Sequence, residues 1–188
     1  MKVHLGCYPK NYKKERKIKI QIDRWDTWST DHTLSLIIHP LLVQLQKTKH
    51  GSPHVDDEDV PEELKSTSAP PKEKEWDTDD NFHKRWDYVL GEMIWAFEQH
   101  NDERAEDKFH TGNHDLYWKK VDADGNEIDG VLYRIGDDKG DSDENTLWEM
   151  VKGPNDTHVF DKEGWEAWSA RKQNGFRLFG KYFQNLWD

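Results

Sequence analysis

The stretch from Asn81 to His100, NFHKRWDYVLGEMIWAFEQH, constrains the fold more than any other part of the chain. Its apolar residues recur at steps of three and four, which places them on one face of an α-helix. They are Phe82, Trp86, Val89, Leu90, Met93, Ile94 and Phe97. Asp79 or Asp80 can cap the start of this helix, and Asn101 with Asp102 marks its end. Because such a wide apolar stripe must be covered, we expect this helix at the centre of the core.

A second helix is predicted between Asp26 and Gly51, where leucines and isoleucines again keep helical spacing. Pro40 falls inside the pattern, so the helix either kinks there or begins its second half there. Since the helix is apolar nearly all round, we expect it to be buried on several sides.

Strand patterns occur near both ends of the chain. Ile18, Ile20 and Ile22 alternate with polar residues, which predicts a half-buried strand, and residues 2–5 fit another short strand. Residues 115–160 predict a β-meander with a hairpin turn at 122–126, and residues 161–187 predict a C-terminal helix.

These elements predict a single α+β domain over residues 1–188, in which long helices pack against a small antiparallel β-meander. Residues 51–80 contain four of the seven prolines and have little periodicity, so they are predicted to be a long surface loop. One helical turn is expected within that loop, at 61–65.

Charge and composition narrow the classes of partner. A net charge of −11 repels nucleic-acid phosphates and membrane surfaces, so we expect no membrane and disfavour nucleic acid as a partner. No apolar run approaches the ~20 residues of a spanning helix, and we expect no signal peptide from the polar first sixteen residues. Charged residues make up 35% of the chain, which favours disorder, but ten Trp, seven Phe and six Tyr indicate a folded, aromatic-rich core.

The chain has one cysteine, Cys7. A single thiol excludes an internal disulfide and any multi-cysteine metal site within one chain, and it is typical of a reducing cytosol.

A candidate metal site lies in the segment HGSPHVDDED, where His50, His54, Asp56 and Asp57 are the candidate ligands. Imidazoles and carboxylates are ligands that zinc, manganese and iron accept, and a metal would neutralise the repulsion among the carboxylates. The alternative is a solvated acidic loop, which is the more common use of such a sequence. We therefore predict no cofactor, with a divalent metal as the alternative.

Two further clusters are weaker metal candidates. His110 and His114 are spaced as in an HxxxH pair, but Gly112 and Asn113 between them favour a turn in a polar connection. An acidic run at 137–144 offers oxygen ligands for calcium without the residue order of an EF-hand, so a solvated turn is favoured there.

Several aromatic side chains are candidates for binding a partner protein. Trp25 and Trp28 flank a helix start, and the C-terminal segment interleaves aromatic with basic residues. Such a segment either packs on the protein itself or contacts a partner. The candidate partner-binding residues are Trp25, Trp28, Phe179, Tyr182 and Trp187.

Four long blocks resemble those of a known group of proteins: RWDTWSTDHTLSLIIHPLLVQLQKTKHGSP, DDEDVPEELKSTSAPPKE, NFHKRWDYVLGEMIWAFEQ and NGFRLFGKYFQNLWD. Together they resemble an uncharacterised family of small acidic proteins encoded by tailed, largely marine bacteriophages. The resemblance covers most of the chain apart from residues 101–145. It implies a location in the cytoplasm of the infected bacterial host or in the virion, and it carries no activity or catalytic residue.

The sequence therefore favours a non-enzymatic phage protein that binds another protein of phage or host origin. It would act as a virion component, or as a modulator of a host factor such as an acidic decoy. No nucleotide-binding or nucleophile motif is present, and no catalytic residue is predicted. The alternative is a metal-dependent hydrolase that acts on phosphoester or nucleotide substrates through a metal-generated hydroxide. The oligomeric state is left open.

Overall fold

The computed structural model describes residues 1–6, 14–134 and 147–187. Helices and antiparallel strands both occur in it, which confirms the predicted α+β class. The chain divides into two compact units: Met1–Ala105 with Ala167–Asp188, here called the helical unit, and Glu106–Glu166, called the sheet unit. The single domain and the packing of helices on the meander stay predictions. Among the described residues, no helix is both long enough and apolar enough to cross a lipid bilayer.

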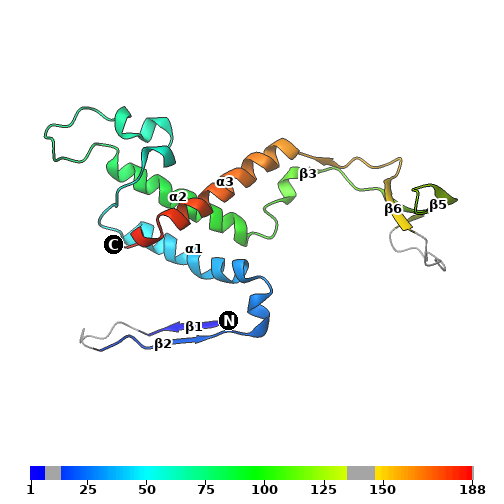
Figure 1. The fold of residues 1–188 in the computed structure, drawn as a ribbon, viewed down its shortest axis with the longest axis horizontal. Coiled ribbons are helices and arrows are strands. Elements are labelled where there is room, and N and C mark those ends of the chain that lie inside the picture. The colour runs from blue at the N-terminus through cyan, green and yellow to red at the C-terminus, as the bar shows by residue number, and fades with distance from the viewer. Residues whose placement is uncertain (7–13, 135–146, 188) are drawn as a thin grey trace. The chain divides into compact units, whose positions relative to one another are not determined.

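The core of the helical unit is built around α2, Phe82–Asn101, as the sequence predicts (Figure 1). Trp86, Val89, Leu90 and Met93 are fully buried on one side of this helix. Asn81 is the N-cap residue, and its backbone N–H donates to Asp79 Oδ1 at 2.9 Å, while Asp102 caps the other end. The predicted central position of this helix is therefore confirmed.

Helix α3, Lys162–Lys181, begins where Asp161 Oδ1 accepts the backbone N–H of Gly164, and a short 3₁₀ turn, Phe183–Asn185, follows its end. The helix approaches α2 closely at Gly175, where an added Cβ would lie 2.4 Å from Ala96 Cβ. Further along the same contact, the Arg171 guanidinium pairs with both carboxylate oxygens of Glu92, at 2.9 and 2.7 Å. A residue without a side chain at position 175 is what allows α3 to pack onto α2.

Helix α1, Thr30–Thr48, runs continuously through Pro40 and packs along α2. Ser35 and Leu42 are buried on it, whereas Leu34, Leu36 and Leu41 are exposed. The prediction that this helix is buried on several sides is therefore wrong, because only one side of it is covered.

The two N-terminal strands, β1 (Lys2–Leu5) and β2 (Ile18–Gln21), form an antiparallel pair in which Val3 lies opposite Ile20. The strands are as predicted, but Ile18, Ile20 and Ile22 are all more than half exposed. The expected half-burial of the isoleucine face is thus wrong. A two-stranded sheet has no second layer of its own to cover that face. Cys7 lies outside the described residues.

The segment 51–80 contains three short 3₁₀ turns, Asp57–Asp59 (η2), Glu62–Leu64 (η3) and Ser66–Ser68 (η4), where one turn was expected. It is also more than a surface loop, because Val55 and Val60 are buried in the same cluster as Trp86 and Leu90. These two valines anchor the segment to the helical core.

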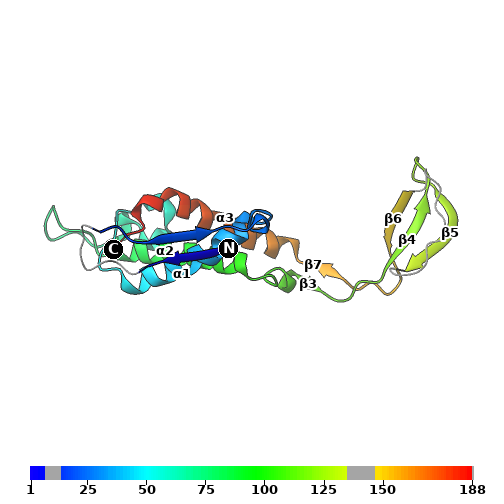
Figure 2. The same cartoon turned by 90° about the horizontal axis from the view of Figure 1, so that it is seen from below.

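In the sheet unit, β4 (Leu116–Val121) lies between β5 (Glu127–Arg134) and β6 (Leu147–Lys152), as Figure 2 shows. A simple meander would place β5 in the middle, so the predicted strand order is wrong. The hairpin turn at 122–126 forms as expected, with Asp122 Oδ1 accepting the backbone N–H groups of Asp124 and Asn126. The acidic run at 137–144 lies outside the described residues.

A second, two-stranded sheet belongs to the same unit. Strand β7, Val159–Phe160, pairs with β3, His110–Thr111, rather than with the predicted meander. A short 3₁₀ turn, Asp107–Phe109, leads into β3. The two chain segments that enter and leave the three-stranded sheet therefore run side by side.

Candidate functional site

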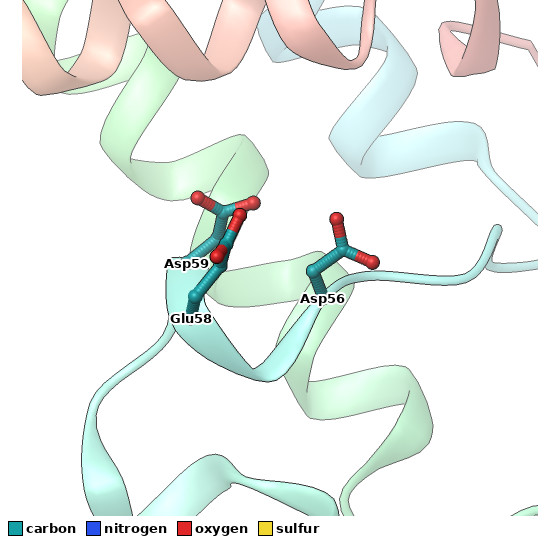
Figure 3. Close-up of side chains that lie close together, drawn as sticks. All are labelled: Asp56, Glu58 and Asp59. Carbon is teal, nitrogen blue, oxygen red and sulfur yellow. The ribbon is translucent and has the colours of Figure 1, made fainter.

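The η2 turn of the helical unit brings three carboxylates together. Asp56, Glu58 and Asp59 point to the same side of the turn, toward the ribbon of α3 (Figure 3). Their oxygens lie within 4.8 Å of one another, and no other group of three His, Cys, Asp or Glu ligand atoms is as close within the part of the chain that the structure describes. Three carboxylates at this spacing repel one another strongly unless a cation lies among them.

The side chain of Lys181 on α3 supplies that cation. Its Nζ lies 2.8 Å from Asp56 Oδ2, 2.8 Å from Glu58 Oε1 and 2.6 Å from Asp59 Oδ2. These three contacts raise the pKa of the Lys181 ammonium well above its ordinary value. The ammonium therefore occupies the position that a metal ion would take among the three carboxylates.

Asp59 is the buried centre of this arrangement, with 1% of its side chain exposed. It accepts hydrogen bonds from the Tyr182 hydroxyl at 2.6 Å and from Arg177 Nη2 at 2.5 Å, in addition to the Lys181 ammonium. Burial alone would raise the pKa of Asp59, but the hydrogen bonds from Lys181, Tyr182 and Arg177 outweigh it and lower that pKa. Burial, and then the bond to Asp59, raise the pKa of Tyr182 to about 12.

We call this set of six side chains the Asp59 network: Asp56, Glu58, Asp59, Arg177, Lys181 and Tyr182. Its three carboxylates come from η2 and the residue before it, Arg177 and Lys181 come from the last turns of α3, and Tyr182 directly follows α3. The Tyr182 hydroxyl also accepts the backbone N–H of Asp56 at 3.0 Å, so backbone and side chains are held together. The network joins segment 51–80 to α3 and leaves the carboxylates largely neutralised.

The predicted metal ligands are distributed differently. Asp56 belongs to the carboxylate group, but His50, His54 and Asp57 do not. Asp57 accepts hydrogen bonds from the backbone N–H and the hydroxyl of Ser66, and His54 Nε2 lies 3.5 Å from Asp56 Oδ1. The structure thus brings one of the four candidate ligands together with Glu58 and Asp59, two carboxylates of the same segment that were not among the four.

A polar cleft of about 370 Å³ adjoins this region. His54, Asp56 and Asp57 line it together with Asp79 and Arg85. The Arg85 guanidinium is buried and paired with both oxygens of Asp79, at 2.9 and 2.7 Å. The Asp79 and Arg85 charges in the lining of the cleft are therefore already paired with each other.

The predicted partner-binding aromatics fall into two groups. Trp25, Trp28 and Trp187 are exposed, and Trp28 is the extreme case at 85%. Phe179 is partly buried and packs edge to face against Phe97, with ring centroids 5.0 Å apart. Tyr182 is only 5% exposed and bonded to Asp59, so it is removed from the predicted docking face and belongs to the core.

An apolar groove, which we call the α1 groove, was not predicted from the sequence. It has a volume of about 400 Å³ and is lined by Leu34, Ile38, Phe97 and Phe176, from three different helices. Asp31, His100 and Lys172 add charged and polar groups to its lining. The four-residue spacing of Leu34 and Ile38 indicates a shared face of the helix, but spacing alone does not show that this face is uncovered.

In comparisons with known proteins, no family model matched this chain, and no curated protein or solved structure was significantly similar to it. The resemblance to bacteriophage proteins therefore stays a prediction from the sequence blocks.

Proposed function

We propose that this protein is non-enzymatic and binds another protein through the α1 groove and the neighbouring 3₁₀ turn. The observation that carries the proposal is the apolar lining of the groove beside leucines that face solvent. Leu34 is 47% exposed and lines the groove, and Leu41, seven residues further along the same helix, is 57% exposed. An uncovered apolar groove of this kind accepts the apolar side chains of a partner helix or loop.

The turn before α1 adds two aromatic anchors. Trp25 lies in the 3₁₀ turn η1, Arg24–Thr27, and Trp28 follows it. Asp23 and Asp26 hold this turn by a reciprocal pair of hydrogen bonds, and the N-terminal ammonium lies 2.7 Å from Asp26 Oδ1. Exposed tryptophans on a well-held backbone lose little conformational entropy on binding, which is why they are frequent among residues that dominate interface energies.

Site-specific photo-crosslinking tests the proposal directly. A photoreactive residue at position 34 is expected to form a defined covalent adduct with the partner in cells that make the protein. The same residue at position 128, an exposed isoleucine of β5, is the matched control and is expected to form none. Leu34→Asp together with Leu41→Asp should weaken binding of the crosslinked partner at least tenfold. Equal crosslinking at positions 34 and 128 would rule out the groove as the docking site.

The biological setting of this binding rests on the sequence resemblance. The resemblance implies a location in the virion or in the cytoplasm of the infected host, and the net charge of −11 suits a decoy for a protein that holds nucleic acid. Recovery of the chain from purified virions would select the first setting, and recovery only from infected-cell lysate would select the second.

A metal-dependent hydrolase is the second candidate. The observation in its favour is that His54, Asp56 and Asp57 line one cleft, which is large enough for a nucleotide-sized ligand. In that function, a divalent metal would generate hydroxide and stabilise phosphoryl oxygens. Elemental analysis of protein purified without chelator distinguishes the two candidates, because a metal-to-protein ratio near zero would remove the hydrolase.

A further inference from the structure

Three histidines from two chain segments form a row of rings in the sheet unit. His110 lies on β3, His114 lies in the irregular segment between β3 and β4, and His158 precedes β7. The ring centroids of His114 and His158 are 3.8 Å apart with an interplanar angle of 23°, and those of His110 and His158 are 5.2 Å apart with an angle of 24°. Phe160 continues the row, with its ring centroid 4.8 Å from that of His110. We call His110, His114 and His158 the histidine ladder.

Two members of the ladder are joined by a direct ring-to-ring hydrogen bond. His110 Nδ1 lies 2.9 Å from His158 Nε2. Since the ring centroids are 5.2 Å apart, the two nitrogens lie between the rings and face each other. Such a bond needs one nitrogen with a proton and one without. The pair keeps its hydrogen bond when neutral or singly charged, but two imidazolium rings would place two N–H groups head to head.

The carboxylates around the histidine ladder carry too little negative charge to neutralise three imidazolium rings. Asp156 is the nearest carboxylate, with Oδ2 3.8 Å from His114 Nδ1 and 3% of its side chain exposed. Its oxygens also accept the backbone N–H groups of Asp115 and His158, and the Lys152 ammonium lies 3.5 Å away. The Asp115 carboxylate accepts the backbone N–H of Asn155, and Phe160 offers no charge. Among the described residues, Asp156 is the one carboxylate paired with a ring of the ladder, and it is shared with Lys152.

We propose that the histidine ladder is a proton-operated latch that holds β3 against β7 while its rings are neutral and releases the two strands when they become charged. The strands it holds are short, with only His110 opposite Phe160 and Thr111 opposite Val159. They also approach closely next to the ladder, since a Cβ at Gly112, whose φ is 75°, would lie 2.1 Å from the Thr157 carbonyl oxygen. Outside the strand pairing, the backbone N–H groups of Asp161 and Thr157 donate to the carbonyl oxygens of Phe109 and Asn113, at 2.8 and 3.0 Å. Repulsion between charged rings would act against these bonds and against the two strand pairs together.

The direction of the pH effect follows from proton linkage. Burial, followed by the proximity of His114 and His110, lowers the pKa of His158, although Asp156 partly offsets this. The opened segments therefore bind more protons than the closed ones below about pH 6.5, the ordinary value for histidine. The latch is closed above that pH and loses stability as the pH falls through it. This inference is independent of the proposed protein binding, because no ladder residue belongs to the α1 groove.

Amide hydrogen exchange of the full-length chain at pH 7.5 and pH 5.5, corrected for intrinsic exchange rates, tests the latch. Residues 109–115 and 157–161 are expected to lose protection by about tenfold per pH unit for each proton taken up on opening. The amides of β4 and β6 are expected to keep their protection. Equal protection of residues 109–115 at the two pH values would overturn the proposal.

Two variants and a titration separate the latch from a general acid effect. His158→Gln cannot be charged and should abolish the pH dependence in both segments, whereas His39→Gln on α1 should leave it unchanged. If His158→Gln opens the segments already at pH 7.5, the NMR titration of the wild-type chain decides. The midpoint for the His158 ring is expected below about 6.5, the ordinary value for histidine, and a midpoint at or above that value would contradict the latch. Protection of the two segments by equimolar zinc at pH 7.5 would also overturn it, because the ladder would then be a metal site.

Discussion

In the helical unit, α2 buries an unbroken row of large side chains, whereas in the sheet unit most large apolar side chains of the described strands face solvent. Trp86, Val89, Leu90 and Met93 have no exposed surface. On β5 and β6, by contrast, Ile128, Val131, Leu132, Leu147 and Met150 are all between 44% and 55% exposed. This difference indicates that apolar burial stabilises the helical unit, and that the sheet unit depends on other interactions.

Hydrogen bonds in polar turns and backbone pairing between strands contribute much of the stability of the sheet unit. Asp115, Asp122 and Asp156 each accept backbone N–H groups from residues in turns, and β4 pairs with a strand on both sides. Individual hydrogen bonds of this kind contribute about 0.5–1.5 kcal/mol, so the unit depends on many small terms. We therefore expect core substitutions to be costly in the helical unit and mild in the sheet unit.

The largest effect is expected from Leu90→Ala. This side chain is fully buried in the cluster that α1, α2 and α3 share, so its truncation leaves a cavity as well as losing buried apolar area. The free energy of unfolding of the helical unit should fall by about 2–5 kcal/mol. Urea unfolding followed by exchange of the α2 amides measures it, and a loss below about 1 kcal/mol would mean that the core is not packed as described.

Asp59→Asn should have the next largest effect. It leaves Lys181, Arg177 and Tyr182 facing a neutral amide in place of a carboxylate that is 1% exposed. Hydrogen bonds to charged groups contribute about 1.5–3 kcal/mol, and a loss of that size is expected in the free energy of unfolding. Glu58→Gln is the matched control: its side chain is 76% exposed, so the loss should stay within about 0.5 kcal/mol.

The same variant gives a pH signature that a change in packing alone would not produce. Because the pKa of Asp59 is lowered in the folded chain, its contribution is present above the unfolded value of about 3.9 and is lost as the pH falls through the folded one. The stability difference between the wild type and Asp59→Asn should therefore shrink below about pH 4. A difference that persists unchanged at pH 2.5 would show that the carboxylate charge is not what holds the network.

Gly175→Ala sharpens the comparison by overfilling the helical core. Its Cβ would lie 2.4 Å from Ala96 Cβ and 2.6 Å from the Glu92 carbonyl oxygen, so α3 must move away from α2. Overpacking of this kind costs about 1–3 kcal/mol in the free energy of unfolding. Gly180→Ala, with open space around its Cβ, is the matched control and should be neutral or stabilising by up to about 1 kcal/mol. Equal effects of the two substitutions in thermal unfolding would contradict the close helix contact.

The sequence was informative where one element carries its own pattern. The α2 helix was predicted closely because its apolar spacing agrees with its burial, although its N-cap residue is Asn81 and not Asp79 or Asp80. The isoleucine face of β2 and the apolar sides of α1 were predicted to be buried because their spacing indicates an apolar face. Spacing defines a face, but what covers it depends on elements far away in the chain. This is why the exposure of both elements was not predictable.

The candidate site could not be predicted from the sequence for a related reason. The carboxylates at 56–59 were conspicuous, but the cations that neutralise them lie more than 110 residues away, at Arg177 and Lys181. Their four-residue spacing places both on one side of α3, which is a sequence signal, but it does not name the acids they meet. The acids were therefore interpreted as possible metal ligands, with no means of finding Lys181.

The smallest effect is expected from Leu132→Ala, which probes the sheet unit directly. Leu132 lies on β5 opposite Lys119 and is 49% exposed, so truncation removes little buried area. The free energy of opening the β4–β5 pair, measured by exchange of its amides, should change by no more than about 0.5 kcal/mol. A loss above about 1.5 kcal/mol would show that another part of the chain or another molecule covers this face in solution. In that case the sheet unit, like the helical unit, would be stabilised by apolar burial, and its exposed face would be the surface that the other segment or molecule covers.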